Sequence, residues 1–258
     1  MRLQYASDLH LENHPCSAWL DAHMPEVAGE VLLLAGDIMH LPVDNSIKNF
    51  SRFADWCSRH YRLTLIVPGN HEYYGGCDVQ STLQDGYDLT LRPNVHYCTN
   101  HSVRLDDNIE IFLTTMWTRI APRNAAQVQE GMSDCQHIAC GGRTLKASDY
   151  GLLHERCTRW LDEALRRSTA LHKIVVTHHC PMLLEDPRYE PNGLSDAFVV
   201  DMTRYIEQHH IDHWIYGHTH YNAGEGTRVG ATTMHCNQLA CTSHGPVAGY
   251  RSAATIVV

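Results

Sequence analysis

Five short stretches of the sequence end in side chains that bind metal ions well. Each follows or contains a short apolar run and closes on residues such as aspartate, asparagine, histidine or glutamate: YASDLH (5–10), LLLAGD (32–37), IVPGNHE (66–72), IVVTHH (174–179) and IYGHTH (215–220). Their nitrogen and oxygen donors form a mixed ligand set without thiolate. Such a set disfavours a structural zinc site and suits Mn, Fe, Co, Ni or catalytic Zn. The sequence therefore predicts a metal-dependent site, provided that the fold brings the stretches together.

The elements that must position these side chains are those of an α/β protein. Short apolar runs predict strands at 2–6, 30–36, 63–69, 109–115, 173–178, 213–218 and 254–258. Amphipathic segments predict helices at 46–60, 148–168 and 196–210. Because the carboxyl ends of parallel strands meet at one edge of a sheet, we expect the five stretches to share one pocket.

The less regular segments 72–100, 116–147 and 180–196 are expected to be loops around that end of the fold. Segment 116–147 carries Trp117 and the cations Arg119, Arg143 and Lys146. These side chains could stack a base or hold a second phosphate of the substrate, and a solvated surface is the alternative interpretation.

The stretches differ in how specific they are. An Asp-x-His pair arises by chance about once in a chain with this many histidines, and Asp21–His23 is interpreted as such an accident. A Gly-Asp pair after a strand also occurs in ordinary turns. The sequences GNHE (69–72) and GHTH (217–220) are much rarer, and their order after predicted strands makes a set of chance turns a poor explanation.

In this order, the motifs Asp8-x-His10, Gly36-Asp37, GNHE (69–72), His178 and GHTH (217–220) resemble the five-block signature of the calcineurin-like metallophosphoesterase superfamily. The resemblance spans residues 8–220 and implies a four-layer αββα sandwich with a dinuclear metal site at the strand carboxyl ends. It implies two ligand groups that share Asp37 as a bridge. One group would be Asp8, His10, Asp37 and His220, and the other Asp37, Asn70, His178 and His218.

The resemblance also implies roles for two residues that do not bind metal. His71 would be the catalytic histidine near the leaving group, and Glu72 would orient it. In the pair His178–His179 either residue could be the ligand; the family pattern favours His178, and His179 would then lie beside the substrate or simply be buried. The phosphoprotein phosphatases of the family carry an arginine shortly after the Gly-Asp block. Here GDIMHL (36–41) has none, so the chain looks more like the small bacterial-type phosphohydrolases.

The chemistry of such a site fits phosphoester hydrolysis. Two divalent ions with two carboxylate ligands leave a local charge of about +2, which attracts an anion. Two ions roughly 3.5 to 4 Å apart can also activate a bridging water and hold the phosphate oxygens for in-line attack. We therefore predict hydrolysis of a small-molecule phosphomono- or phosphodiester by a metal-bridging hydroxide, with Mn or Fe favoured over Zn, Ni or Co. The choice between monoester and diester, the natural substrate and the oligomeric state stay open.

Composition limits the alternatives. The 258 residues carry a formal charge of −9, which argues against a nuclease that binds DNA or RNA through a broad basic surface. A non-catalytic scaffold has no chemical need for seven metal-binding side chains at strand ends. No linker or repeat divides the chain, so we expect one domain over 1–258. With no membrane-length apolar stretch, no signal peptide and ten scattered cysteines, we expect a cytoplasmic protein with reduced thiols.

Overall fold

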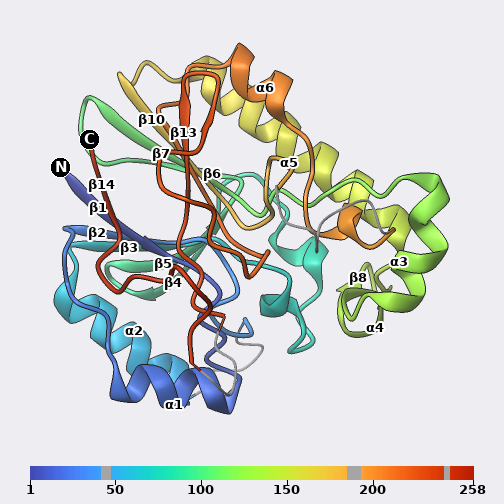
Figure 1. Cartoon of the computed structure of the whole chain (residues 1–258), viewed down its shortest axis with the longest axis horizontal. Coiled ribbons are helices and arrows are strands. Elements are labelled where there is room, and N and C mark those ends of the chain that lie inside the picture. Colours follow the sequence, from blue (N-terminus) through green and yellow to red (C-terminus); the bar gives the residue numbers. More distant parts are fainter. Residues whose placement is uncertain (42–47, 185–192, 241–244) are drawn as a thin grey trace.

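The computed structural model describes residues 1–41, 48–184, 193–240 and 245–258, with only the backbone for 48–50. Within these ranges the chain forms two six-stranded sheets packed face to face, with helices on their outer faces (Figure 1). This arrangement confirms the predicted αββα sandwich.

The first sheet has four parallel strands, β1 (Arg2–Ala6), β2 (Val31–Leu34), β3 (Leu63–Ile66) and β5 (Val95–Thr99). Its edges are the antiparallel strands β14 (Thr255–Val257) and β4 (Tyr87–Arg92), in the order β14-β1-β2-β3-β5-β4. The helices α1 (His14–Ala22) and α2 (Lys48–His60) cover its outer face (Figure 1).

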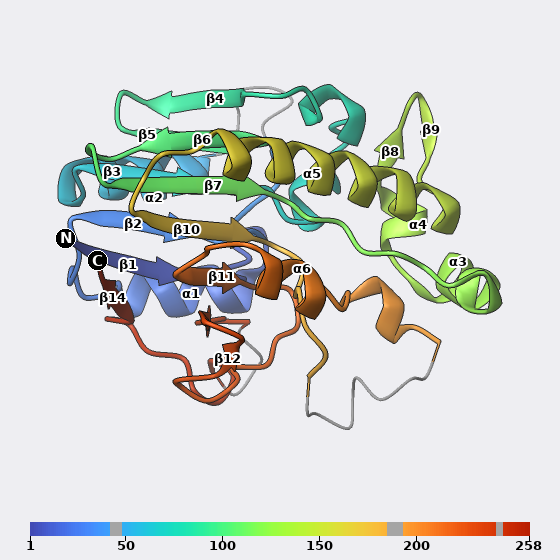
Figure 2. The same ribbon diagram turned by 90° about the horizontal axis from the view of Figure 1, so that it is seen from above.

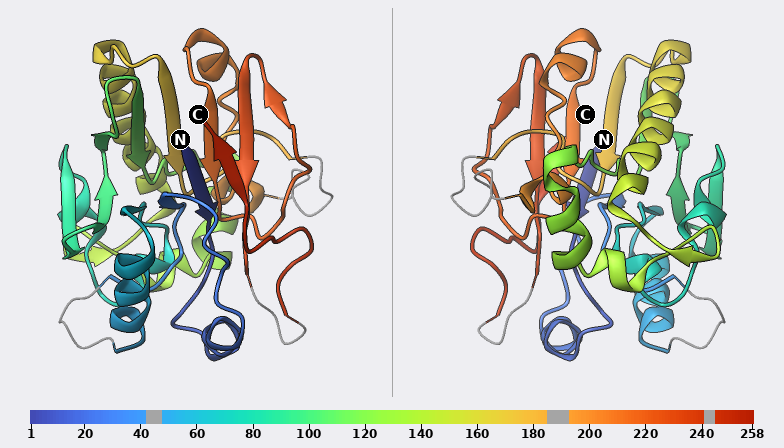
Figure 3. Two further views of the ribbon diagram at one scale, coloured as in Figure 1. Left: turned by 90° about the vertical axis from the view of Figure 1, so that its left-hand side faces the viewer. Right: turned by 90° about the vertical axis from the view of Figure 1, so that its right-hand side faces the viewer.

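The second sheet repeats this plan. Its parallel strands are β7 (Ile109–Thr114), β10 (His172–Thr177), β11 (His213–Tyr216) and β13 (Thr232–Cys236). The antiparallel edges are β6 (His101–Arg104) and β12 (Arg228–Val229), in the order β12-β13-β11-β10-β7-β6. Helices α5 (Ala147–Arg167) and α6 (Thr203–Gln208) lie on the outer face (Figure 3).

Alternate residues of the central strands belong to two separate hydrophobic cores. In β2, Val31 and Leu33 pack into the core between the sheets, whereas Leu32 and Leu34 pack on the helical side. Because side chains alternate between the two faces of a strand, both faces must be apolar, and all four residues of β2 are buried. This explains why the parallel strands appear in the sequence as continuous apolar runs.

The predicted loops contain more regular structure than the sequence suggested. Segment 72–100 holds the strands β4 and β5, which pair with each other as a hairpin, while β5 also pairs with β3. Segment 116–147 holds α3 (Ala125–Gly131), α4 (Asp134–His137) and the hairpin of β8 (Ala139–Cys140) and β9 (Arg143–Thr144). It lies at the end toward which β1, β7 and β10 point (Figure 2). Part of 180–196 lies outside the described residues.

Other predictions need smaller corrections. The predicted helix 196–210 is only a short 3-10 turn, Ser195–Ala197, followed by α6. Helix 46–60 begins outside the described residues and is observed as α2. Several strands end two or three residues early, because the last residues of each apolar run leave the sheet and enter the turns that carry the metal-binding side chains. The nine described cysteines are free thiols, and no described helix is long and apolar enough to cross a membrane.

Candidate metal centre

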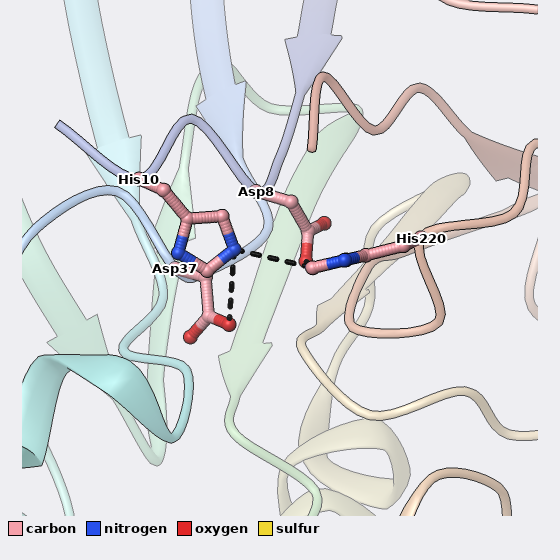
Figure 4. Close-up of side chains that lie close together, drawn as sticks. All are labelled: Asp8, His10, Asp37 and His220. Carbon is pink, nitrogen blue, oxygen red and sulfur yellow. Dashed lines mark hydrogen bonds and ion pairs between the residues drawn. The ribbon is translucent and has the colours of Figure 1, made fainter. Parts of the chain in front are cut away.

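The first predicted ligand group comes together above the carboxyl ends of β1 and β2 (Figure 4). Its members are Asp8, His10, Asp37 and His220, whose ligand atoms all lie within 4.8 Å of one another. The Nε2 atoms of His10 and His220 face each other at 3.1 Å, and His220 Nε2 lies 3.4 Å from Asp8 Oδ1. His10 Nε2 lies 3.8 Å from Asp37 Oδ2.

The second group lies on the other side of Asp37. Its ring nitrogens are His178 Nε2 and His218 Nδ1, which are 3.1 Å apart. Asn70 Oδ1 lies 3.0 Å from His178 Nε2, and Asp37 Oδ1 lies 3.4 Å from the same nitrogen. Asp37 thus turns Oδ1 toward this group and Oδ2 toward the first, which is the geometry of a bridging carboxylate.

Hydrogen bonds to the outer nitrogens fix which ring atoms face these groups. His10 Nδ1 donates to Glu12 Oε1 at 2.9 Å, and His178 Nδ1 donates to the Ala35 carbonyl at 2.9 Å. His218 donates from Nε2 to the Ala197 carbonyl at 3.2 Å, which leaves Nδ1 for the site. Such bonds are the usual support of metal-bound histidines.

The donor set fits divalent cations. When each ring carries one proton, on its outer nitrogen, the atoms that face inward are ring nitrogens with a lone pair, carboxylate oxygens and one amide oxygen. The pairs of these atoms given above lie 3.0 to 3.8 Å apart, and in that state they are all acceptors, so positive charge is needed between them. The second group is almost completely buried: His178 is 0% and His218 is 6% exposed.

Most of the proposed ligands have an unusual backbone. Asp8, His10, Asp37, His218 and His220 all have φ between 45° and 72°, a region that non-glycine residues rarely adopt. Each such residue costs roughly 1 to 3 kcal/mol, which the surrounding structure must offset. Backbone bonds from Asp8 N to Gly36 O and from His10 N to Asp37 O hold these turns at 2.9 and 3.0 Å. Because several strands end in tight turns of this kind, their side chains converge on one site.

The glycines of the motifs leave room for the ligands. A Cβ at Gly69 would lie 2.2 Å from Asp37 Oδ1, and one at Gly36 would lie 2.3 Å from His178 Nδ1. At Gly217 the nearest atom is Asp8 Oδ2, at 2.7 Å. The glycines of GD, GNHE and GHTH are therefore required by close packing around the ligand side chains.

His71 lies beside the ligand groups and faces the cavity. Its ring lies 4.6 Å from that of His10 and stacks on Tyr74 at 4.4 Å. Its Nδ1 is 3.2 Å from Glu12 Oε1, so Nε2 is the nitrogen left for a substrate. Glu12, which the sequence analysis did not single out, thus contacts both His10 and His71.

The hydrogen bonds of the Glu72 carboxylate go to groups other than the His71 ring, although the resemblance implied that Glu72 orients this histidine. It is fully buried and accepts hydrogen bonds from the backbone N–H groups of Asp37, Ile38 and Gly69 at 3.0, 2.8 and 2.7 Å. Glu72 therefore ties the Gly36–Asp37 turn to the turn that carries His71, and the side-chain contact with His71 belongs to Glu12.

The protein's own charges make the site attractive to cations. Burial opposes protonation, yet the charge of Asp37 raises the pKa of His178 to about 9. For His71 burial is again outweighed, and Asp37 together with Glu12 raises the pKa to about 9. Burial and the neighbouring His178 instead lower the pKa of His218 to about 3. The carboxylates of Asp37 and Glu12 thus favour positive charge beside the histidine rings of the site.

A cavity of about 430 Å³ opens onto both ligand groups. Ligand residues and His71 form one side, and Tyr74, Met132, Leu194 and Phe198 contribute to the other. The Phe198 ring stacks on His218 with their centroids 5.0 Å apart. None of the described residues that line the cavity is lysine or arginine. Apart from the ligand residues and His71, the described wall is mostly apolar and aromatic, with Ser133, Asp134 and Thr219 as its polar members.

The predicted substrate contacts lie elsewhere. Arg143 forms a bidentate bond to Asp149 at 2.7 and 2.8 Å, Arg119 lies 3.7 Å from Glu155, and Lys146 precedes the first residue of α5. Trp117, considered as a stacking surface for a base, is instead fully buried against Tyr73, Tyr150 and His179. The role of the three cations as substrate contacts stays a prediction, and their positions favour the alternative of a solvated surface.

Of the histidine pair, His178 is the one that joins a ligand group. His179 is fully buried, donates from Nδ1 to the Thr115 carbonyl at 3.3 Å and packs on His218 with ring centroids 4.3 Å apart. It is not among the residues that line the cavity. His179 therefore lies behind the site as a buried residue, which was one of the two alternatives for it.

Three residues of this site, Glu12, Asp134 and Phe198, belong to none of the five motifs. Glu12 lies two positions after His10 in the stretch DLHLE, and this short spacing was the one available signal. Asp134 and Phe198 lie in the segments 116–147 and 195–202, far from any motif. No local pattern marked either of them.

Comparison with known proteins places the chain in a family. A family model described as calcineurin-like phosphoesterase matches residues 1–222, so the chain belongs to this family of metal-binding hydrolases. The chain is also 28% identical over 253 residues to an uncharacterized protein, L509, of Acanthamoeba polyphaga mimivirus. That match covers 86% of this chain and 85% of the viral protein.

A solved structure shows the same fold. Phosphopantetheinyl hydrolase from Mycobacterium tuberculosis superposes with a TM-score of 0.61 over 92% of this chain and 88% of that one, at 16% identity. A putative 5'-nucleotidase from Staphylococcus aureus matches with a TM-score of 0.47, also at 16% identity, over 92% of this chain and 48% of its own length. At 16% identity the likeness to the phosphopantetheinyl hydrolase concerns the fold alone.

Proposed function

We propose that the chain hydrolyses small-molecule phosphomono- or phosphodiesters with two divalent metal ions held on either side of Asp37. The observation that carries this proposal is the orientation of Asp37, whose Oδ2 faces His10 and whose Oδ1 faces His178, in two separate groups of metal-binding side chains. The matching family model supports it. Because the ligands come from both sheets, we further propose that residues 1–258 act as one domain.

Two divalent ions bound there would supply the positive charge that activates water and stabilises the charge developing on the phosphate. The protein residues hold those charges in place. The oxygen and nitrogen donors suit Mn or Fe, which we favour over Zn, Ni and Co. The ligand set contains no thiolate, so binding of these ions does not require deprotonation of a buried cysteine.

His71 is placed to act on the leaving group. Its Nδ1 contacts Glu12, its ring is held between His10 and Tyr74, and it borders the cavity. We propose that His71 Nε2 donates a proton to the departing oxygen, a role that typically contributes about 10² to 10⁴ in rate. Glu12 keeps the ring in the orientation that presents Nε2.

The cavity wall supports a substrate with a single phosphate and an apolar or aromatic group. Met132, Leu194 and Phe198 offer apolar surface beside the ligand groups, and no lysine or arginine lines the described part of the cavity. A nuclease or polyphosphate hydrolase normally needs cations at this position to hold further phosphates. The formal charge of −9 also weighs against a nucleic-acid substrate.

A reconstitution experiment tests the proposal. The purified chain is stripped with chelator, supplied with Mn, Fe, Co, Ni or Zn, and assayed on aryl phosphate monoesters and diesters. We expect hydrolysis to depend on added metal and to saturate at two ions per chain. Full activity in the metal-free protein, or no metal binding with an intact fold, would support the scaffold alternative. Better turnover of an oligonucleotide than of every aryl ester, with steep salt dependence, would support a nuclease.

A further inference from the structure

Asp134 is a buried carboxylate at the wall of the cavity that no motif marked. It begins α4 in the segment 116–147 and is 0% exposed. Oδ1 accepts hydrogen bonds from Asn70 Nδ2 at 2.8 Å and from the Tyr74 hydroxyl at 2.5 Å, and Oδ2 accepts one from the Tyr150 hydroxyl at 2.6 Å. Burying a carboxylate is costly unless donors satisfy it, and here three donors do.

The bond to Asn70 decides which end of that amide faces the metal centre. An Asn side chain has an oxygen that can bind a cation and an NH₂ group that cannot, and the two ends have nearly the same size. A carboxylate is an acceptor only, so the NH₂ group must face Asp134. The oxygen then points the other way, to within 3.0 Å of His178 Nε2. With the amide reversed, two oxygens would face each other at Asp134 and the NH₂ group would face the ion.

We propose that Asp134 is a positioning residue that fixes Asn70 with its oxygen toward the metal ion held by His178 and His218. This inference rests on the proposed function, because it takes Asn70 to be a metal ligand. Asp134 touches neither the ion nor the substrate and acts through the amide of Asn70.

The other partners of Asp134 strengthen this placement. Tyr150 comes from α5, is fully buried and packs edge-on against Trp117 with ring centroids 5.4 Å apart, so it anchors the carboxylate to the core. Tyr74 stacks on His71 with an angle of 22° between the rings. The same carboxylate therefore connects the Asn70 amide with the ring that supports His71.

The substitution Asp134→Asn tests the inference because it keeps the shape of the side chain. The new amide has one oxygen for three donors, so its NH₂ group must face either Asn70 or the tyrosines, and Asn70 loses its fixed orientation. We expect the affinity for the second metal ion to fall about 10- to 100-fold, the range found when outer partners of metal ligands are lost. The ion at Asp8, His10 and His220 should bind as before. Titration with Mn²⁺ under equilibrium dialysis measures both.

Exchanging the two groups gives a sharper test. In Asn70→Asp/Asp134→Asn, the carboxylate at position 70 can bind the ion with one oxygen and accept the new NH₂ group with the other. In Asn70→Asp alone, two carboxylates face each other. We therefore expect Asp134→Asn to weaken the second ion at least tenfold in the wild type but to strengthen it in the Asn70→Asp background. A general loss of packing would weaken binding in both backgrounds.

Tyr150→Phe is the matched structural control, since it removes one donor to Asp134 but leaves the bond to Asn70. Equal loss of Mn²⁺ affinity in Tyr150→Phe and Asp134→Asn would overturn the inference, as would unchanged affinity in Asp134→Asn. If Asp134→Asn alone does not fold, the comparison of Asn70→Asp with the double variant decides, and no gain in the double variant contradicts the proposal. A wild-type protein that binds no second ion would instead refute the proposed function.

Discussion

The strand-end turns and the segment 116–147 border the same cavity, yet they are built in different ways. The turns carry ligands on a left-handed backbone packed against glycines, with Asp37 Oδ1 where a Cβ at Gly69 would have to lie. Segment 116–147 forms short helices and a hairpin, and it reaches the site through the Asp134 side chain and the apolar wall at Met132. The turns hold the donors themselves, whereas the segment supports and encloses them.

This difference predicts how each region responds to substitution. A change in a strand-end turn that removes or displaces a proposed metal ligand should cause a large loss on every substrate. A change in segment 116–147 should act through a partner or through the cavity wall, so the loss should be smaller and should depend on the substrate or the metal.

The largest effect is expected for Asp37→Asn. It removes an anionic donor from both ligand groups at once, so both ions should bind more weakly and kcat/KM should fall by more than about 10³-fold. Metal analysis of the purified variant and kinetics on an aryl ester measure the two effects. Asp21→Asn, in the chance Asp-x-His pair on α1, is the control and should change neither. Two tightly bound ions and near-normal turnover in Asp37→Asn would show that Asp37 does not bridge the two ions.

His71→Ala should separate binding from chemistry. We expect both ions to be retained while kcat on a poor alkoxide leaving group falls about 10²- to 10⁴-fold, because general acid catalysis is lost. A nitrophenyl ester needs less help from an acid and should lose distinctly less. Equal losses on the two esters, with a lower melting temperature, would make His71 a structural residue. Glu12→Gln should give a milder form of the same pattern, because it weakens the contact that holds the ring.

The strand-end part of the site and the parallel strands could be predicted because both depend on local sequence. A ligand such as Asn70 directly follows the apolar run of its strand, and a run such as VLLL (31–34) is apolar on both faces because helices and a second sheet cover it. Asp134 could not be predicted, since its partner Asn70 is 64 positions away. Strand β4 lacks a signal for a different reason: none of its residues is buried, so no apolar run marks it, although it forms a local hairpin with β5.

Gly69→Ala should show how tightly the turns are packed. Its Cβ would lie 2.2 Å from Asp37 Oδ1, so either the carboxylate or the turn must move. A displacement of about 1 Å in a reacting group can cost about 10²-fold in rate, and we expect a loss of that order in kcat/KM. Gly151→Ala is the contrasting control, because nothing lies within 4 Å of a Cβ at that helical position. It should leave activity unchanged and raise the unfolding free energy by about 0.5 to 1 kcal/mol. Similar activity in the two variants would contradict the packing argument.

The smallest effect is expected for the cations of segment 116–147. Arg119→Ala, Arg143→Ala and Lys146→Ala remove side chains that do not line the cavity, so KM should change by less than about twofold on both a large substrate and a minimal aryl ester. A KM that rises for the large substrate alone would restore these residues as substrate contacts. Segment 116–147 would then bind the substrate through its cations in addition to enclosing the site.

The central claim is that Asp37 bridges two metal ions, and anomalous diffraction from crystals soaked in Mn²⁺ tests it most directly. We predict two peaks roughly 3.5 to 4 Å apart, one on each side of Asp37. One peak should contact Asp8, His10 and His220, and the other Asn70, His178 and His218. A single peak, or two peaks that do not share Asp37 as a ligand, would contradict the account.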